Sequence, residues 1–212
     1  MSQASYLFQL NYAPSVDAMA LMSVSPTAVI EAHDHYQKQS FRNRCLLLSS
    51  QGVLPLVIPV QHEQGNPIPY QQARFETSRP WAIQHWRSLV SSYNKSAYFH
   101  YYSPHFEAIY QQAGTDLYAF NWRILEVFCK LFKLPLPVEN SAWENLPEQH
   151  VDVREIFHPK KGTSFPPAPY YQTFEMKEGF VSGLSAFDVL FNLGPDASDY
   201  LKKRGEQLLP LL

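Results

Sequence analysis

Residues 6–32 read YLFQLNYAPSVDAMALMSVSPTAVIEA, and this stretch decides the fold of the chain. Its two ends, residues 6–11 and 27–32, have the length and apolar composition of strands. Between them, residues 16–24 form a short apolar segment with Asp17 near its start, and Ser15 is a candidate N-cap, which predicts a helix. A strand, a helix and a second strand in this order predict a β-α-β unit and therefore an α/β fold.

Two further strands are predicted directly after this unit. Residues 44–48 and 54–60 are rich in Leu, Val and Ile, and Gln51-Gly52 between them suggests a hairpin. Together with the first two strands, they predict a mixed sheet in the N-terminal third of the chain.

The rest of the chain predicts helices that pack on this sheet, with one long loop. A helix begins after Pro80, a second runs from Pro104 to Gly114, and a third carries a broad apolar face over residues 117–132. Residues 136–169 are rich in Pro and polar residues and predict a long loop, and two final helices follow at 185–193 and 196–208. The prediction is a single compact domain over residues 1–212.

Composition and charge exclude several classes of function. The formal net charge of -2, from 17 Lys and Arg against 19 Asp and Glu, offers no basic field, so we expect no nucleic-acid partner. Pro14 and Pro26 interrupt the first thirty residues, which predict neither a signal peptide nor a membrane span, and a cytoplasmic location is expected. The two cysteines are expected to be reduced thiols.

Several motifs together resemble the WbqC-like family. Residues 36–45 read YQKQSFRNRC and lead into a strand, and residues 56–60 read LVIPV. The later matches occur in the same order as in the family: HW at 85–86, SSY at 91–93, YF at 98–99, DVR at 152–154, PK at 159–160, YQTF at 171–174, GF at 179–180 and LSAFDVLFNLGP at 184–195. The resemblance covers nearly the whole chain.

This resemblance implies a bacterial protein of glycan metabolism. Some family members are encoded in gene clusters for O-antigen and other surface polysaccharides, and transfer of an amino acid such as glycine onto a sugar has been proposed for them. The family opening Gln-Pro-x-Tyr-x-Pro-Trp-x-Gly-Tyr is here QLNYAPSVDA at residues 9–18, with Ser15 and Asp17 at the Trp and Gly positions. The bulk and charge of Asp17 would oppose a phosphate at this turn.

The basic segment predicts an anion-binding site. If the segment is extended, Arg42 and Arg44 share one face and could both hold a phosphate or carboxylate, with Lys38 nearby. Gln37 and Asn43 would orient polar groups, and stacking walls would come from Trp86, Tyr98 and Tyr171. The alternative is a solvated edge whose arginines pair with acidic neighbours.

A second charged segment lies in the Pro-rich stretch. Asp152 and Arg154 point the same way if this segment is extended, and Lys160 follows shortly after. The three residues predict a lid that carries charge to a ligand. The alternative is an internal ion pair that fixes the loop against the body of the protein.

The catalytic residues are unknown, and three are candidates. Basic neighbours would lower the pKa of the Cys45 thiol, although an extended segment points Cys45 away from both arginines towards the core. His85 could act as a general base or pack among aromatic residues. Asp188 fits a helix-capping spacing with Ser185, and it could instead hold Arg42 or Arg44 in place.

Neither a metal nor a cofactor is expected. His33 and His35 share one side of a strand, but no third ligand is identifiable. The expected partner is an anionic small molecule. The rival hypothesis is a non-catalytic binding or scaffold protein whose aromatic surface docks a partner enzyme, and a cleft that joins Arg42, Arg44, Asp152 and Lys160 would favour the small-molecule site instead.

Overall fold

Four parallel strands form the central sheet. The computed structural model describes residues 5–61, 67–140, 150–159 and 165–212. Strands β1 (Ser5–Phe8), β2 (Ala28–Glu31), β5 (Val138–Asn140) and β6 (His150–Asp152) are arranged in the order β5-β2-β1-β6, and every neighbouring pair is parallel. The α/β class is therefore confirmed.

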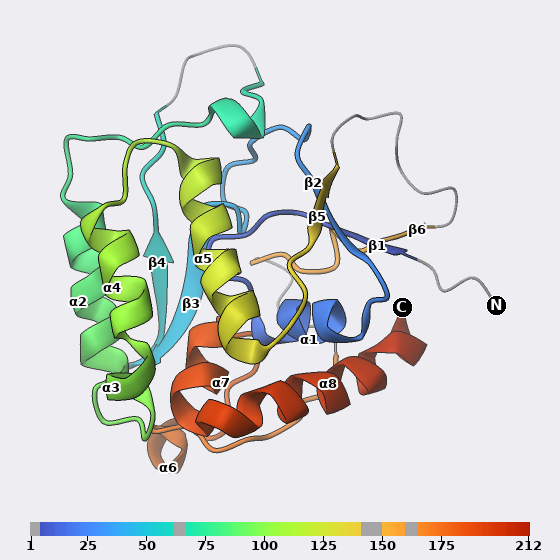
Figure 1. Ribbon diagram of the computed structural model, residues 1–212. Helices are drawn as coiled ribbons and strands as arrows, with labels where there is room; N and C mark the ends of the chain where they lie inside the picture. The colour runs from blue at the N-terminus through green and yellow to red at the C-terminus, as the bar shows by residue number, and fades with distance from the viewer. Residues whose placement is uncertain (1–4, 62–66, 141–149, 160–164) are drawn as a thin grey trace.

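The predicted β-α-β unit is present. Helix α1 (Val16–Val24) joins β1 to β2 (Figure 1), and the Ser15 hydroxyl accepts a hydrogen bond from the Ala18 N–H at 3.2 Å, which caps its first turn. Because β2 lies on one side of β1 and β6 on the other, the direction in which successive strands are added reverses between β1 and β6. In open parallel sheets, ligands bind outside the carboxyl ends of the strands at such a switch point.

Strands β3 (Arg44–Ser49) and β4 (Gly52–Val57) form a separate antiparallel hairpin. The predicted hairpin is confirmed, but the strands divide between two sheets and do not form one mixed sheet. Within β4, Pro55 lies opposite Leu46 and is exposed. Proline has no backbone N–H, so it is tolerated in a strand where that group has no hydrogen-bonding role.

Seven further α-helices are described. Those in the middle of the chain are α2 (Trp81–Tyr93), α3 (Phe99–Tyr102), α4 (Pro104–Gln111) and α5 (Leu117–Phe132). Those near the end are α6 (Glu175–Glu178), α7 (Ala186–Leu193) and α8 (Ala197–Leu208). Figure 1 shows α5 between the hairpin and strand β5, with α8 running beneath α1. Three 3-10 helices complete the described elements: η1 (Tyr70–Gln72), η3 (Gly194–Asp196) and η4 (Leu209–Leu211).

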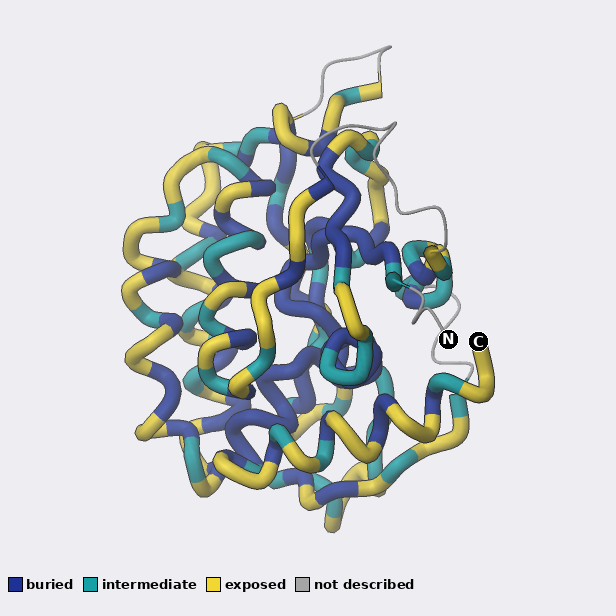
Figure 2. Tube along the Cα trace, turned by 45° about the vertical axis from the view of Figure 1, so that its right-hand side comes forward, coloured by how far each residue is buried: buried dark blue, intermediate teal, exposed yellow. Residues whose placement is uncertain are grey.

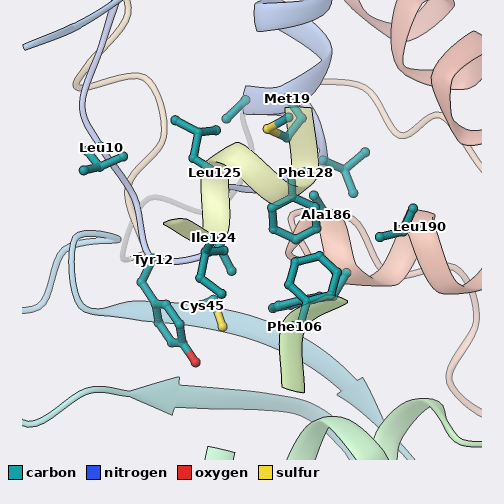
Figure 3. Packing of buried hydrophobic residues seen from close by; sticks show 14 of the residues in the cluster. Leu10, Tyr12, Met19, Cys45, Phe106, Ile124, Leu125, Phe128, Ala186 and Leu190 are labelled. Atoms are coloured by element: carbon teal, nitrogen blue, oxygen red, sulfur yellow. The ribbon is translucent and has the colours of Figure 1, made fainter. Parts of the chain in front are cut away.

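The core is rich in aromatic rings. Phe106, Phe128 and Phe187 come from three different helices, and their ring centroids lie 4.8 to 5.0 Å apart. Figure 2 shows buried chain running through the middle of the molecule, and Figure 3 shows Phe106 and Phe128 beside one another within this core. The high aromatic content of the sequence is therefore largely used in packing.

The predicted long loop is wrong in part, because two strands interrupt it. β5 and β6 have only three residues each, and β5 has the sequence Val-Glu-Asn. Neither shows a periodic apolar pattern, and both are stabilised by pairing with β2 and β1. Among the residues that the structure describes, no helix is long and apolar enough to cross a membrane.

Candidate functional site

Two charged segments far apart in the sequence meet beyond the carboxyl ends of β2 and β6. Arg42 donates a hydrogen bond from Nη2 to Asp34 Oδ2, and Arg154 Nη1 lies 4.0 Å from the same oxygen. Arg154 also pairs with Asp152, where Nη2 and Oδ2 are 2.7 Å apart. Asp34 therefore joins the two predicted charged segments. We call Asp34, Arg42, Asp152 and Arg154 the charged edge.

Buried polar contacts support this edge from the sheet. Glu31, at the end of β2, accepts hydrogen bonds from Asn140 Nδ2 at 3.0 Å and from the His33 N–H at 2.7 Å. The pKa of Arg154 is raised, mainly by its hydrogen bonds with Asp152, and Asp34 and Glu31 contribute further. The same hydrogen bonds hold the pKa of Asp152 below its usual value. Asp152 and Arg154 thus each favour the charged form of the other.

Arg42 is completely buried, which is unusual for an arginine. Its carbonyl accepts a hydrogen bond from Asn121 Nδ2 at 2.7 Å, and its guanidinium carbon lies 5.8 Å from the centre of the Tyr70 ring. Among the described residues, however, its Nε and Nη1 atoms contact no hydrogen-bond acceptor. A buried charged donor without a partner costs more than about 1–3 kcal/mol, so these two atoms mark a place that suits an acceptor.

Arg44 and Arg42 both act electrostatically on Tyr36. Burial raises the pKa of Tyr36 to about 12, against the opposing effects of the Arg44 and Arg42 guanidiniums. The strand begins only at Arg44, however, while Arg42 lies in the preceding turn and pairs with Asp34. The Arg44 Nε atom also has no acceptor within the described part of the chain. Arg42 does pair with an acidic neighbour, Asp34, but it is buried and does not lie at a solvated edge.

The remaining predicted ligand residues differ in exposure. Gln37 and Lys38 are exposed, and Asn43 is buried and donates a hydrogen bond to the Ile58 carbonyl at 2.8 Å. Lys160 lies outside the described residues. The predicted lid therefore stays a prediction, and so does its alternative: Arg154 pairs with Asp152 of its own segment, and Arg154 Nη1 lies 4.0 Å from Asp34 Oδ2 of another segment.

The three predicted stacking residues differ in their surroundings. Trp86 packs against Phe99 and Tyr110 within the helical region. Tyr98 packs under Gly194, where an added Cβ would lie 2.4 Å from its ring. Tyr171 is 60% exposed. Of these three residues, only Tyr171 is exposed.

Two catalytic candidates are deeply buried. Cys45 is 1% exposed and faces the core near Tyr12 (Figure 3), and burial raises the pKa of its thiol, which opposes formation of a thiolate. His85 Nδ1 is 3.0 Å from the Tyr12 hydroxyl, and burial lowers the pKa of His85 to about 4. His85 is therefore neutral at physiological pH and packed among aromatic rings.

Among the described residues Asp188 bonds to no arginine, so the prediction that it holds Arg42 or Arg44 is wrong. Its Oδ2 atom accepts hydrogen bonds from the Tyr170 hydroxyl at 2.6 Å and from Gln172 Nε2 at 3.0 Å. Burial raises the pKa of Asp188 to about 6. The carboxyl group thus organises the segment before α7, whereas the arginines of the charged edge pair with Asp34 and Asp152.

Sequence reasoning missed Asp34 and Glu31 as members of the site. Glu31 ends β2 of the predicted β-α-β unit and Asp34 follows it. This position was the available signal, because ligand sites gather at the carboxyl ends of parallel strands. Within the described residues, no group of three or more His, Cys, Asp or Glu side chains is placed to hold a metal.

Comparison with known proteins assigns the chain to a family. The chain is 26% identical to the uncharacterized protein Rv1507c of Mycobacterium tuberculosis over 227 aligned positions, which cover 92% of this chain and 96% of that protein. No solved structure matches this chain. A family model described as the WbqC-like protein family matches residues 9–158, a range that contains the whole charged edge. The chain therefore belongs to the WbqC-like protein family.

Proposed function

We propose that this protein binds the phosphate or carboxylate group of a small molecule at the charged edge, as a transferase-like protein of bacterial surface-polysaccharide metabolism. The transferred group would be an amino acid such as glycine, and the acceptor a sugar. Membership of the WbqC-like family supports this part of the proposal. Two free cysteines support a reducing location such as the cytoplasm.

The observation that carries the binding proposal is the buried Arg42 guanidinium with two donors that contact no described acceptor. A guanidinium presents five N–H groups in one plane, a geometry that suits the oxygens of phosphate and carboxylate. Asp34 accepts from only one nitrogen of Arg42. The remaining donors give this position a capacity to bind an anion.

Arg154 supplies the accessible side of the site. Its side chain is 21% exposed, and that of Asp34 is 19% exposed, so solvent reaches both. The Arg154–Asp152 pair is partly exposed, and such pairs contribute only about 0–1 kcal/mol. A doubly charged phosphate can therefore replace Asp152 as the partner of Arg154 at small cost.

The position in the sheet supports the same conclusion. Arg154 follows β6, and β6 and β1 flank the switch point of the sheet. Ligands of parallel α/β proteins bind in this region because helix and loop termini open there while the strands beneath stay rigid.

Calorimetric titration with inorganic pyrophosphate and with a uridine diphosphate sugar tests the binding proposal. Arg154→Ala should weaken binding at least about tenfold, since a charge-assisted hydrogen bond contributes roughly 1.5–3 kcal/mol. Arg74→Ala is the matched control, because Arg74 forms a 2.9 Å surface pair with Asp116. Equal affinity of Arg154→Ala and the wild type would show that the charged edge does not bind the anion.

The transfer proposal needs a separate measurement. Mass spectrometry of an amino sugar nucleotide incubated with the protein, glycine and ATP should detect a glycyl amide. ATP would activate the glycine carboxylate, and the phosphate-bearing group would leave when the sugar amine attacks. Arg154→Ala should reduce the yield of the amide. Binding without any amide would leave a non-catalytic anion-binding protein.

One observation favours a docking function as the second candidate. Val53 and Val57, on β4, are 47% and 42% exposed, with the exposed Pro55 between them. An exposed apolar stripe of this kind can contact a partner enzyme. Substitution of both valines by threonine should then abolish co-elution with that partner while anion binding persists.

A further inference from the structure

A cavity of about 70 Å³ is lined in part by residues next in sequence to the charged edge. Its apolar wall comes from Phe41, Leu46, Phe157 and Pro159. Phe41 directly precedes Arg42, and Phe157 lies three residues after Arg154, so the cavity and the charged edge are built from the same two segments. The start of α1 closes another side through Ser15 and Asp17.

The size and lining of the cavity suit a short apolar group. A cavity of this volume has room for roughly two water molecules, or for a group of about three to four heavy atoms. Phe41 and Phe157 line it from two different segments of the chain. Binding of an alkyl group against such apolar walls is favourable because it removes apolar surface from water.

The remaining wall is held in place from α7. Gln172 Oε1 accepts a hydrogen bond from the Val181 N–H at 2.9 Å, and Gln172 Nε2 donates to the Val181 carbonyl at 2.8 Å. Val181 leads directly into Ser182 and Gly183, which line the cavity. Gln172 Nε2 also donates to Asp188 Oδ2, and Asp188 is 1% exposed. A chain of hydrogen bonds therefore runs from the interior of α7 to the cavity wall.

We infer that this cavity binds a short aliphatic group of the same small molecule whose anionic group binds at the charged edge, and that Asp188 is a positioning residue for its wall. The inference rests on the proposed function, because the anionic group anchors the ligand at Arg154. It adds the chemical class of the ligand: an anion that carries a short, uncharged aliphatic chain.

Titration with inorganic phosphate and with monoalkyl phosphates from ethyl to hexyl tests the inference. Once the chain is long enough to enter the cavity, affinity should rise by up to about fourfold for each methylene and then level off when the cavity is full. Ser182→Leu fills the cavity and should remove this dependence on chain length while the affinity for inorganic phosphate persists. Ser88→Leu on α2 is the matched control and should retain it.

The outcomes separate the two proposals. If affinity is the same for all chain lengths, or if Ser182→Leu keeps the increase, the cavity does not bind the chain and the inference is wrong. If inorganic phosphate does not bind at all, the proposed function fails, and the inferred two-part ligand fails with it. A titration with n-butanol, followed by the amide signals of Phe157 and Ser182, then tests the cavity alone; the absence of shifts would exclude it as an apolar site.

Variants of Asp188 test the positioning role. Asp188→Asn keeps an oxygen that can accept from Tyr170 and Gln172, so the dependence on chain length should survive. Asp188→Leu removes both hydrogen bonds and should abolish that dependence without changing the affinity for inorganic phosphate. If Asp188→Leu does not fold, Gln172→Met severs both bonds to Val181 and serves instead. An unchanged dependence on chain length in the folded variant would refute the positioning role.

Discussion

Arg204 of α8 and Asp17 of α1 form a buried two-point ion pair, with Nε 2.7 Å from Oδ1 and Nη2 3.2 Å from Oδ2. Their side chains are only 4% and 8% exposed. Asp17 stands where the family opening often has glycine, and its charge is balanced by the C-terminal helix. The pair thus joins the first helix of the chain to the last long one.

Removing one member of this pair should destabilise the protein strongly. Asp17→Ala leaves the Arg204 charge buried without its partner, and the free energy of unfolding should fall by about 3–5 kcal/mol. Urea denaturation measures this change. Arg74→Ala, which breaks an exposed pair, should cost no more than about 1 kcal/mol. Similar losses in the two variants would contradict the structural role assigned to the buried pair.

The contact between α1 and α8 should not tolerate a methyl group at Gly205. A Cβ there would lie 2.3 Å from the Ala20 carbonyl oxygen and 2.8 Å from a methyl carbon of Val24. Gly205→Ala should therefore lower the free energy of unfolding by about 1–3 kcal/mol, although alanine favours helices. The exposed Lys203→Ala on the same helix should change it by less than about 0.5 kcal/mol. A gain in thermal stability for Gly205→Ala would show that the helices are farther apart.

Asp188 should make the protein less stable as pH rises through the acid range. Its pKa is raised from 3.8 to about 6 by burial, so between these values the folded state holds a proton that the unfolded state has lost. This contribution to stability is fully present below about pH 4 and is lost as pH rises to about 6, with a size of roughly 3 kcal/mol. Because Asp188→Asn lacks this loss, urea denaturation should show its stability rising by roughly 3 kcal/mol relative to that of the wild type between pH 4 and 7.

His85 should produce the opposite dependence. Burial lowers its pKa from 6.5 to about 4, so the unfolded state binds a proton that the folded state does not. Stability from this group is present above pH 6.5 and is lost as pH falls towards 4, again by roughly 3 kcal/mol. The two effects should largely cancel in the wild type. His85→Gln should therefore lose more stability relative to the wild type at pH 7 than at pH 4. Identical pH profiles of the two proteins would contradict this assignment.

The two thiols should be inert in the folded protein. Cys45 is 1% and Cys129 3% exposed, and burial raises the pKa of Cys129 to about 12. Reaction with a chromogenic disulfide reagent should be slow in buffer and fast for both thiols in urea. Cys45→Ala should leave anion binding unchanged. Rapid labelling of the native protein, or lost binding, would return Cys45 to the list of catalytic candidates.

Local signals were enough to predict most helices. Ser15 caps α1 as expected, Pro80 precedes α2, and the apolar face over residues 117–132 is α5. These features depend on neighbours within a few residues, and the printed sequence contains all of them. Strands β5 and β6 depend on pairing with residues more than a hundred positions away, so no local pattern indicated them.

The site was predictable only in pieces. Arg42, Asp152 and Arg154 were identified from their motifs, but their meeting at Asp34 is a tertiary contact between three separate segments. Arg42 was expected on an accessible strand face because arginine is rarely buried. Its burial depends on the Asp34 carboxylate and the Tyr70 ring, and neither partner was recognisable from spacing.

Pro55 has a consequence for the free side of the hairpin. Pro55 lies opposite Leu46 and donates no N–H to it. A residue other than proline at this position would present its N–H at the outer edge of β4. Another extended chain that approached this edge would meet a missing donor at its centre, between two exposed valines. The hairpin can therefore show an apolar face to its surroundings while resisting the growth of β-structure from one molecule to the next.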